Sequence, residues 1–331
     1  MKKIAVFGSG YIGNVHAEAI QKSGGLQLAA FVQRDGEKSR AASEKYGVPC
    51  FADAGEMLNK INPDILDICL PSASHEEFVL FAAQHKKHVI CEKPFSLSSE
   101  SCARMVQACA GAGVKLMVAQ VLRWFPEYMK IKELLPKLGP LHGVSCYRLA
   151  QHPNWTNWHR DPKISGGGLF DLLLHEIDYL YSLFGEVDHV YAAGWKTPTG
   201  CWNHVLSTLS FKNGVKVQAE GCSEMIGNYP FSAAFRAVGD EGTLDYKLSA
   251  GFNIENLGAA SNKLTFFGKD KDPAEVTWEA ADAFLLELDA FAESVETGKP
   301  VPIPPEDSLY VIKITEAIRR SLETGKTESV Y

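Results

Sequence analysis

The sequence predicts a two-domain α/β protein: a doubly wound parallel sheet, then an α+β domain with a large, mostly antiparallel open sheet. Three observations support this fold class. Short apolar strands alternate with amphipathic helices early in the chain, a glycine-rich turn follows the first strand, and the pattern changes near residue 141. At 331 residues the chain exceeds the usual size of a single hydrophobic core. We expect a first domain over residues 1–120, where the glycine-rich turn indicates dinucleotide binding, and a second domain over residues 121–331.

Short apolar segments in the first domain have the composition of buried parallel strands. They are KIAVFG, LQLAAFV, ILDICL, KHVICE and KLMVAQ, each an almost continuous apolar run. Helical patterns lie between them, at 16–21, 36–46 and 75–85. Strands and helices that alternate in this way are joined by right-handed crossovers, so we expect a parallel sheet with helices on both faces.

The second domain begins with a different pattern, typical of antiparallel strands. In FKNGVKVQAEG, Asn213 and Gly214 form a hairpin turn signal before a segment that alternates apolar and polar residues. Similar strands are expected at 187–197, 201–211, 231–238 and 263–268, and two late helices near 281–297 and 307–323.

Composition excludes several classes of partner. The chain has 46% hydrophobic and 22% charged residues and a net charge of −7, without a basic stripe, which argues against nucleic acid or an anionic membrane as a partner. No apolar run approaches the roughly 20 residues of a membrane-spanning helix. The eight cysteines include no Cys-x-x-Cys pair, which favours free thiols in a cytoplasmic protein over a disulfide framework or a metal site.

A glycine-rich turn connects the first strand to the first helix. VFGSGYIGNVH places Gly8, Gly10 and Gly13 in the Gly-x-Gly-x-x-Gly spacing. The first glycine allows a tight turn, the second lets a pyrophosphate approach the backbone, and the third lets the helix pack closely on the sheet. Amide groups at the helix start then face the phosphates. The predicted dinucleotide-binding residues here are Gly8, Ser9, Gly10, Tyr11, Ile12 and Gly13.

The end of the second strand indicates which dinucleotide binds. NAD-binding proteins of this type carry an acidic residue there, which binds the ribose 2′-hydroxyl. This chain has Gln33 at that position, followed by Arg34. A guanidinium can pair with a 2′-phosphate, and no carboxylate repels it. We therefore expect a preference for NADP(H), while a neutral Gln33 with a solvated Arg34 would leave NAD(H) possible.

Polar residues follow the other strands of the first domain. In open parallel sheets, ligands bind at the carboxyl ends of the strands. The further candidate cofactor-binding residues at these ends are Pro71, Ser72, His75, Glu92, Lys93 and Gln120. Lys93 could exchange a proton or a hydrogen bond with a substrate hydroxyl, and the positive charge of an oxidised nicotinamide would lower its pKa. A Glu-Lys-Pro tripeptide by itself is more typical of a surface turn than of an active site.

The stretch GGGLFDLLLHEID, residues 166–178, runs from three glycines into an apolar segment. With a helix starting near Leu169, Asp171 and His175 lie four residues apart on one face. Asp171 then occupies the first turn, where the helix dipole favours a negative charge. One hypothesis makes Asp171 and His175 a proton-handling pair that contacts substrate. The other makes Asp171 an ordinary first-turn acid and His175 a hydrogen-bonded core residue.

Aromatic and basic residues suggest where a substrate would bind. QHPNWTNWHRDPKISGGG carries Trp155, Trp158 and Arg160, and LRWFPEY carries Arg123 and Trp124. Indole faces stack on the C–H faces of sugar rings, and polar groups bind hydroxyls. The tryptophans could instead pack a domain junction or a sheet edge. Arg160 could recognise an acidic substrate, or it could pair with Asp161 or Glu176.

Together these motifs resemble the Gfo/Idh/MocA family, named for glucose–fructose oxidoreductase, inositol dehydrogenase and MocA. The resemblance includes the three glycines of the loop, PSASH, EKP at 92–94, AQVLRWFPEY at 119–128, GGGLFDLLLHEID and FAESVETGKPVPIPPED. It implies a Rossmann domain and NAD(P)-dependent oxidation or reduction of sugars, cyclitols and related polyols. It places the family's catalytic lysine on Lys93 and its Asp-x-x-x-His pair on Asp171 and His175. It also implies a homodimer or homotetramer formed through the C-terminal sheet.

The resemblance implies a mechanism and leaves two alternatives. His175 would act as the general base for the substrate hydroxyl, Lys93 would stabilise the developing alkoxide, and Asp171 would orient the imidazole or bind a neighbouring hydroxyl. One alternative is a glycosidase that oxidises its substrate transiently with tightly held NAD. The other is a non-enzymatic, nucleotide-sensing relative, for which we would expect the lysine or the histidine to be lost.

Overall fold

The computed structural model describes residues 1–34, 36–152, 158–250 and 261–331. The chain divides into two compact units. The first unit consists of residues 1–124 and 281–310, and the second consists of residues 125–280 and 311–331. The late segment 281–310 therefore belongs with the N-terminal residues, although all but the last strand of the second sheet lies between them in the sequence.

The first unit is built on a parallel sheet, as predicted. Its strand order in the described residues is β3-β2-β1-β4-β5-β6, and every neighbouring pair is parallel. The order reverses next to β1, which is where a doubly wound sheet leaves a crevice for ligands. The strands are β1 (Lys2–Phe7), β2 (Leu26–Val32), β3 (Cys50–Phe51), β4 (Ile65–Ile68), β5 (His88–Glu92) and β6 (Leu116–Ala119).

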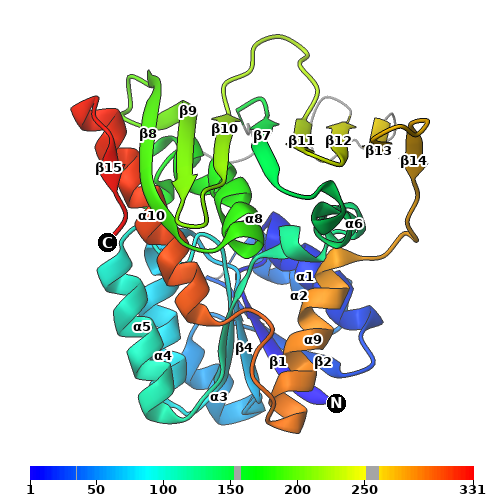
Figure 1. Cartoon of the computed structure of the whole chain (residues 1–331). Helices are drawn as coiled ribbons and strands as arrows, with labels where there is room; N and C mark the ends of the chain where they lie inside the picture. The colour runs from blue at the N-terminus through cyan, green and yellow to red at the C-terminus, as the bar shows by residue number, and fades with distance from the viewer. Residues whose placement is uncertain (35, 153–157, 251–260) are drawn as a thin grey trace. The chain divides into compact units, whose positions relative to one another are not determined.

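Helices cover both faces of this sheet, with α1 and α9 on one side and α4 and α5 on the other (Figure 1). Leu288 and Phe291 of α9 share a buried apolar cluster with Ile20 and Leu26. Burying a side chain of this size stabilises the fold by roughly 1.5–3 kcal/mol. The helices of the unit are α1 (Tyr11–Lys22), α2 (Glu37–Tyr46), α3 (Ala54–Ile61), α4 (His75–Gln84), α5 (Ser99–Ala112) and α9 (Ala283–Thr297), with short 3₁₀ turns η1 (Ser72–Ser74) and η2 (Val121–Trp124).

The second unit contains a large open sheet, in agreement with the predicted fold class. Among the described residues its strand order is β14-β13-β12-β11-β7-β10-β9-β8-β15, antiparallel except for the parallel pair β7 and β10. The strands are β7 (Leu141–Leu149), β8 (Val187–Lys196), β9 (Trp202–Phe211), β10 (Lys216–Cys222), β11 (Ser232–Gly239), β12 (Gly242–Ser249), β13 (Ser261–Gly268), β14 (Ala274–Val276) and β15 (Glu328–Ser329).

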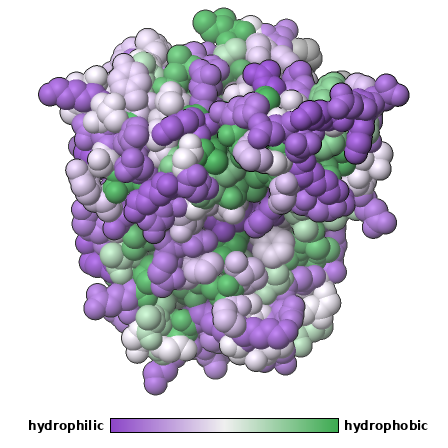
Figure 2. Space-filling model, in the orientation of Figure 1, coloured by the Kyte–Doolittle hydropathy of each residue, from purple (hydrophilic) through white to green (hydrophobic). Residues whose placement is uncertain are grey.

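The predicted hairpin at Asn213 and Gly214 connects β9 to β10. Gly214 has a φ of 93°, a conformation that favours glycine, and the Gly214 amide donates to the Phe211 carbonyl. Along β10, Val217 and Ala219 are buried while Lys216 and Gln218 are exposed, so the alternation in the sequence does mark the two faces of the sheet. Hydrophilic and hydrophobic residues are interspersed on the face of the molecule that Figure 2 shows.

The helices of the second unit pack on the buried face of its sheet. Arg148 of β7 and Glu176 of α8 form a buried ion pair with a 2.8 Å Nε–Oε2 distance, and the Arg148 guanidinium also donates to the Tyr128 hydroxyl at 3.1 Å. The helices are α6 (Pro126–Leu134), α7 (Pro162–Ser165) and α8 (Leu174–Phe184), with 3₁₀ turns η3 (Leu135–Leu138) and η4 (Trp158–Arg160) and a π-helical turn η5 (Leu169–Leu173); α10 (Pro305–Thr324) begins in the first unit and ends in the second. None of the helices in the described part of the chain is long and apolar enough to cross a lipid bilayer.

Candidate functional site

The glycine-rich loop between β1 and α1 has little room for side chains at two of its glycines. A Cβ on Gly13 would lie 2.0 Å from the Gly8 carbonyl oxygen, and one on Gly8 would lie 2.5 Å from the Cys69 carbonyl oxygen. A Cβ on Gly10, in contrast, would meet no described atom within 4 Å. Gly10 is also the N-cap of α1, and no side chain of the described residues caps this helix end. An open approach to an uncapped helix N-terminus fits a pyrophosphate.

The end of β2 is tied to this loop by a side chain. The carbonyl oxygen of the Gln33 carboxamide accepts from the Ser9 amide at 3.0 Å and from the Ser9 hydroxyl at 3.3 Å. The NH₂ group of Gln33 remains as a hydrogen-bond donor beside the loop. Arg34, the next residue, is exposed, as is Tyr11 at the start of α1, while Ile12 is half-buried.

The residues after β4, β5 and β6 lie at one edge of the sheet, because these strands are parallel neighbours. Pro71 and Lys93 are half-buried and Ser72 is buried. His75 is fully buried, and its two ring nitrogens lie 2.8 Å from the Leu70 carbonyl oxygen and 3.3 Å from the Phe95 carbonyl oxygen. Burial lowers the pKa of His75, which favours a neutral imidazole that donates to one of these two carbonyls. Its contacts hold the loop after β4 next to the segment that follows Lys93.

Glu92 belongs to a buried network that the sequence did not reveal. Oε2 of Glu92 accepts from the Lys93 amide at 2.9 Å, and Oε1 lies 3.1 Å from Nε2 of His16. Nδ1 of His16 lies 3.0 Å from Asp67 Oδ2, and the Cys69 thiol donates to Asp67 at 3.3 Å. Burial lowers the pKa of His16, but the charge and hydrogen bond of Asp67 outweigh burial, and the pKa lies well above its ordinary value of 6.5. His16, Asp67 and Cys69 also lie close enough together to be metal ligands, but they already hydrogen bond to one another.

Gln120 and Arg123 follow β6. Nε2 of Gln120 donates to the Ser308 hydroxyl at 3.4 Å, while its buried Oε1 has no hydrogen-bond partner among the described residues. A buried acceptor of this kind is suited to a donor on a ligand, such as a carboxamide. Arg123 pairs with Asp307 at 3.1 Å, and Trp124 packs against the apolar core of the first unit.

In the second unit, the helix starts at Leu169 as expected, but its first turn differs in type. This turn is the π-helical η5, and regular α-helix begins only at Leu174. The amides of Phe170 and Asp171 both donate to the Gly167 carbonyl at the start of this turn. Asp171 and His175 therefore belong to different helical elements, and the α-helical spacing assumed for them does not apply. Single π-helical turns occur often at functional sites.

Asp171 lines a small polar pocket of the second unit. The other residues that line it are His152, His159, Ser165, Gly167, Gly168, Asn203 and Ser223. Arg160 donates through Nε to His152 at 3.1 Å. Its proposed partners are engaged elsewhere, since Asp161 caps α7 through the Lys163 amide and Glu176 pairs with Arg148.

The remaining predicted site residues are the two tryptophans and His175. Trp158 lies in η4, half-buried, with its ring centroid 3.7 Å from that of His159. Trp155 lies outside the described residues. His175 is half-buried at the start of α8. Sequence reasoning missed His152, Asn203 and Glu224, which come from three distant segments and share no spacing that could have connected them.

These features define the class of the protein. A parallel sheet with a close-packed glycine loop, an uncapped helix N-terminus and polar residues at the strand ends is the architecture of a dinucleotide-binding oxidoreductase. Residues 2–120 match the family described as an oxidoreductase family with an NAD-binding Rossmann fold, and residues 132–330 match the C-terminal α/β domain of the same family. The chain therefore belongs to the Gfo/Idh/MocA oxidoreductase family.

Individual relatives extend this comparison along nearly the whole chain. A D-xylose 1-dehydrogenase (NADP⁺) of Haloferax volcanii is 28% identical over 90% of this chain and 90% of its own length. A myo-inositol 2-dehydrogenase of Thermotoga maritima is 25% identical over 98% of this chain and 97% of its own length. The structure of an aldose–aldose oxidoreductase from Caulobacter crescentus, complexed with glycerol, shares the fold with a TM-score of 0.87 at 22% identity, covering 99% of both chains.

Proposed function

We propose that this protein is an NAD(P)-dependent dehydrogenase or reductase that transfers a hydride between the nicotinamide and a carbinol or carbonyl carbon of a sugar, cyclitol or related polyol. The observation that carries the proposal is the close-packed glycine loop with an open approach at Gly10. The half-buried Lys93 follows Glu92 at the carboxyl end of β5, and Asp171 lines a polar pocket in the second unit. The relatives named for xylose and inositol support the substrate class.

When bound, the nicotinamide supplies or accepts the hydride. The glycine loop binds the pyrophosphate, and Gln120 Oε1 accepts a hydrogen bond from the nucleotide. His175 takes the hydroxyl proton in the oxidation direction and returns it in reduction. Lys93 donates to the same substrate oxygen and stabilises alkoxide charge as it develops. Asp171 orients the imidazole or accepts from a neighbouring substrate hydroxyl. The meeting of Lys93 and His175 at one substrate oxygen is part of this proposal.

The experiment is a panel of polyols and keto sugars with NADP⁺, NADPH, NAD⁺ and NADH, followed at the nicotinamide absorbance band. Lys93→Ala and His175→Ala should each lower kcat at least about a hundredfold, while cofactor affinity is retained. His142→Ala, at an exposed histidine, is the control and should leave kcat unchanged. Near-normal turnover in either active-site variant removes the assignment. Glycoside cleavage without a net absorbance change would support the glycosidase alternative.

We also propose a preference for NADP(H) over NAD(H). Because the Gln33 carbonyl already accepts from Ser9, the carboxamide offers only N–H donors to the ribose end of the cofactor. The Gln33 NH₂ group and the nearby exposed Arg34 suit a 2′-phosphate, whose oxygens only accept hydrogen bonds. We expect NADPH to bind at least about tenfold more tightly than NADH, and Arg34→Ala to remove most of that difference. Equal affinities in the wild type, unchanged by Arg34→Ala, would contradict this preference.

We also propose that the protein is a homo-oligomer and that it is located in the cytoplasm. A homodimer or homotetramer formed through the second sheet is supported by the exposed Tyr191, Trp195 and Leu206 of β8 and β9, which are 47%, 51% and 41% exposed. Light scattering should give a mass that is a multiple of the chain mass, and Trp195→Lys combined with Leu206→Lys should give the monomer. A monomeric wild type would refute this assembly. The eight cysteines, all free thiols, support a cytoplasmic location.

A further inference from the structure

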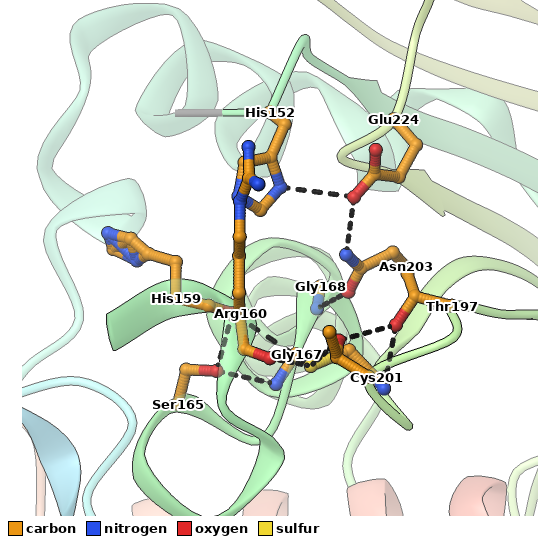
Figure 3. A network of polar contacts seen from close by, with 11 residues as sticks. His152, His159, Arg160, Ser165, Gly167, Gly168, Thr197, Cys201, Asn203 and Glu224 are labelled. Carbon is orange, nitrogen blue, oxygen red and sulfur yellow. Dashed lines mark hydrogen bonds and ion pairs between the residues drawn. The ribbon is translucent and has the colours of Figure 1, made fainter. Parts of the chain in front are cut away.

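Two neighbouring backbone amides just before η5 are held by side chains (Figure 3). The Gly167 amide donates to Ser165 Oγ at 3.0 Å, and the Gly168 amide donates to Asn203 Oδ1 at 2.8 Å. Amides at the start of a helix have no partner within the helix, so they need acceptors from elsewhere. Ser165 is close in the chain, but Asn203 belongs to β9, 35 residues further on. A distant strand therefore holds the start of this helical turn.

The carboxamide of Asn203 is fixed in one orientation. A backbone amide can only donate, so the oxygen of this carboxamide faces Gly168. Its NH₂ group then faces Glu224 and donates to Oε1 at 2.7 Å. The same Oε1 lies 3.0 Å from Nδ1 of His152, whose Nε2 accepts from Arg160 at 3.1 Å. Asn203 is thus held at both ends, by a donor on one side and by an acceptor on the other.

Close packing brings η5 directly against the strands that hold it. A Cβ on Gly168 would lie 2.6 Å from Ser223 Oγ. A Cβ on Gly221 of β10 would lie 2.6 Å from Leu173 Cβ, at the far end of η5. Neither position has room for a larger residue. Asn203 is itself only 2% exposed, so its carboxamide is buried beside this turn.

One peptide group links Asn203 to Asp171. The Gly167 carbonyl and the Gly168 amide belong to the same planar peptide group, so an acceptor that fixes the amide also fixes the direction of the carbonyl. The Asp171 amide donates to this carbonyl at 2.9 Å. The turn then continues into α8, which carries His175. Asn203 and Asp171 both line the small polar pocket described above.

We infer that Asn203 is a positioning residue, which sets the place of Asp171 in the pocket wall by holding the peptide group between Gly167 and Gly168. This inference rests on the proposed function, in which Asp171 orients the imidazole of His175 or accepts from a substrate hydroxyl. Asn203 acts through the backbone of the turn. Its removal should therefore slow the reaction even where the protein stays folded and binds its cofactor normally.

Variants of nearly equal shape separate the hydrogen bond from the space that the side chain fills. Asn203→Leu keeps the branched shape but offers no acceptor to Gly168, and Asn203→Ala removes the same acceptor without adding apolar bulk. Asn203→Asp combined with Glu224→Gln keeps the net charge and exchanges the two groups. In this double variant the aspartate carboxylate accepts from Gly168, and the glutamine NH₂ group donates to the aspartate. Asn62→Asp, at an exposed asparagine of the first unit, is the control.

We would measure kcat, KM and the cofactor dissociation constant at a temperature where each variant is fully folded, and amide exchange over residues 166–173 by mass spectrometry. Asn203→Leu and Asn203→Ala should speed exchange of the Gly168 amide and lower kcat at least about tenfold, with the cofactor dissociation constant within about twofold of the wild type. The double variant should keep kcat and the slow exchange within about threefold of the wild type. Asn62→Asp should change neither.

The outcomes separate this inference from the proposed function. Faster exchange of the Gly168 amide with a normal kcat would make Asn203 only structural and overturn the inference. A double variant as slow as Asn203→Leu would also overturn it, because the acceptor for Gly168 is retained there. A wild type that transfers no hydride, or whose turnover survives His175→Ala, would refute the proposed function and the inference with it. Turnover that His175→Ala abolishes but Asn203→Leu leaves intact would refute the inference alone.

Discussion

Replacement of His16 by glutamine should destabilise the protein more than any surface substitution. His16 and Asp67 are fully buried, and Glu92 is nearly so. The two imidazole nitrogens lie 3.0 Å from Asp67 and 3.1 Å from Glu92, so the variant leaves two buried carboxylates without their shared cation. Breaking a buried ion pair costs about 3–5 kcal/mol. At roughly 2–4 °C per kcal/mol for a protein of this size, the melting temperature should fall by roughly 6–20 °C.

The free energy of unfolding that His16→Gln loses should depend on pH in a defined direction. Since the pKa of His16 in the folded protein lies well above 6.5, the folded state binds this proton more tightly than the unfolded state. The contribution of His16 to the free energy of unfolding is therefore complete below pH 6.5 and decreases as the pH rises through the folded-state pKa. The difference between wild type and His16→Gln, measured by urea unfolding at a series of pH values, should shrink as the pH increases.

A control and a double variant test whether the loss of stability comes from buried carboxylates left without a cation. His142 and Asp240 form the same kind of pair at the surface, 2.6 Å apart and more than half exposed, and His142→Gln should change the free energy of unfolding by less than about 1 kcal/mol. Asp67→Asn in the His16→Gln background should restore part of the loss, because it removes one buried charge. A loss below about 1 kcal/mol in His16→Gln, or one that grows with pH, would refute the reasoning.

The remaining predictions concern the glycine loop and the buried ion pair between Arg148 and Glu176 in the second unit. Gly10→Ala should leave the melting temperature within about 2 °C but weaken nucleotide binding at least about tenfold, measured by quenching of nicotinamide fluorescence, since its Cβ meets only open space where a phosphate would bind. Gly13→Ala should lower both stability and binding, because its Cβ would overlap the Gly8 carbonyl. Arg148→Met should lower the free energy of unfolding by about 3–5 kcal/mol, and adding Glu176→Leu should recover most of that loss in thermal unfolding. A Gly10 variant that binds nucleotide normally, or a double variant no more stable than Arg148→Met, would contradict these expectations.

The sequence by itself determined the class of fold and the local devices within it. The apolar runs of the first strands, the glycine spacing after β1 and the turn at Asn213 and Gly214 are all set by interactions between residues close in the chain. Such features follow periodicity and backbone preference, so they can be read without knowing what lies across the core. The candidate residues at the strand ends could also be predicted from the sequence, because parallel strands end at one edge of the sheet and ligands bind there.

Only the tertiary structure decided which side chains meet. His16 contacts Asp67 and Glu92, and α9 packs on α1. Arg160 donates to His152 rather than pairing with Asp161 or Glu176. The first turn before His175 is the π-helical η5 rather than an α-helical turn. The contacts of His16 and of α9 join segments tens to hundreds of residues apart, and no local pattern carries that information. Packing density and the need to pair buried polar groups select one partner among several that the sequence leaves open.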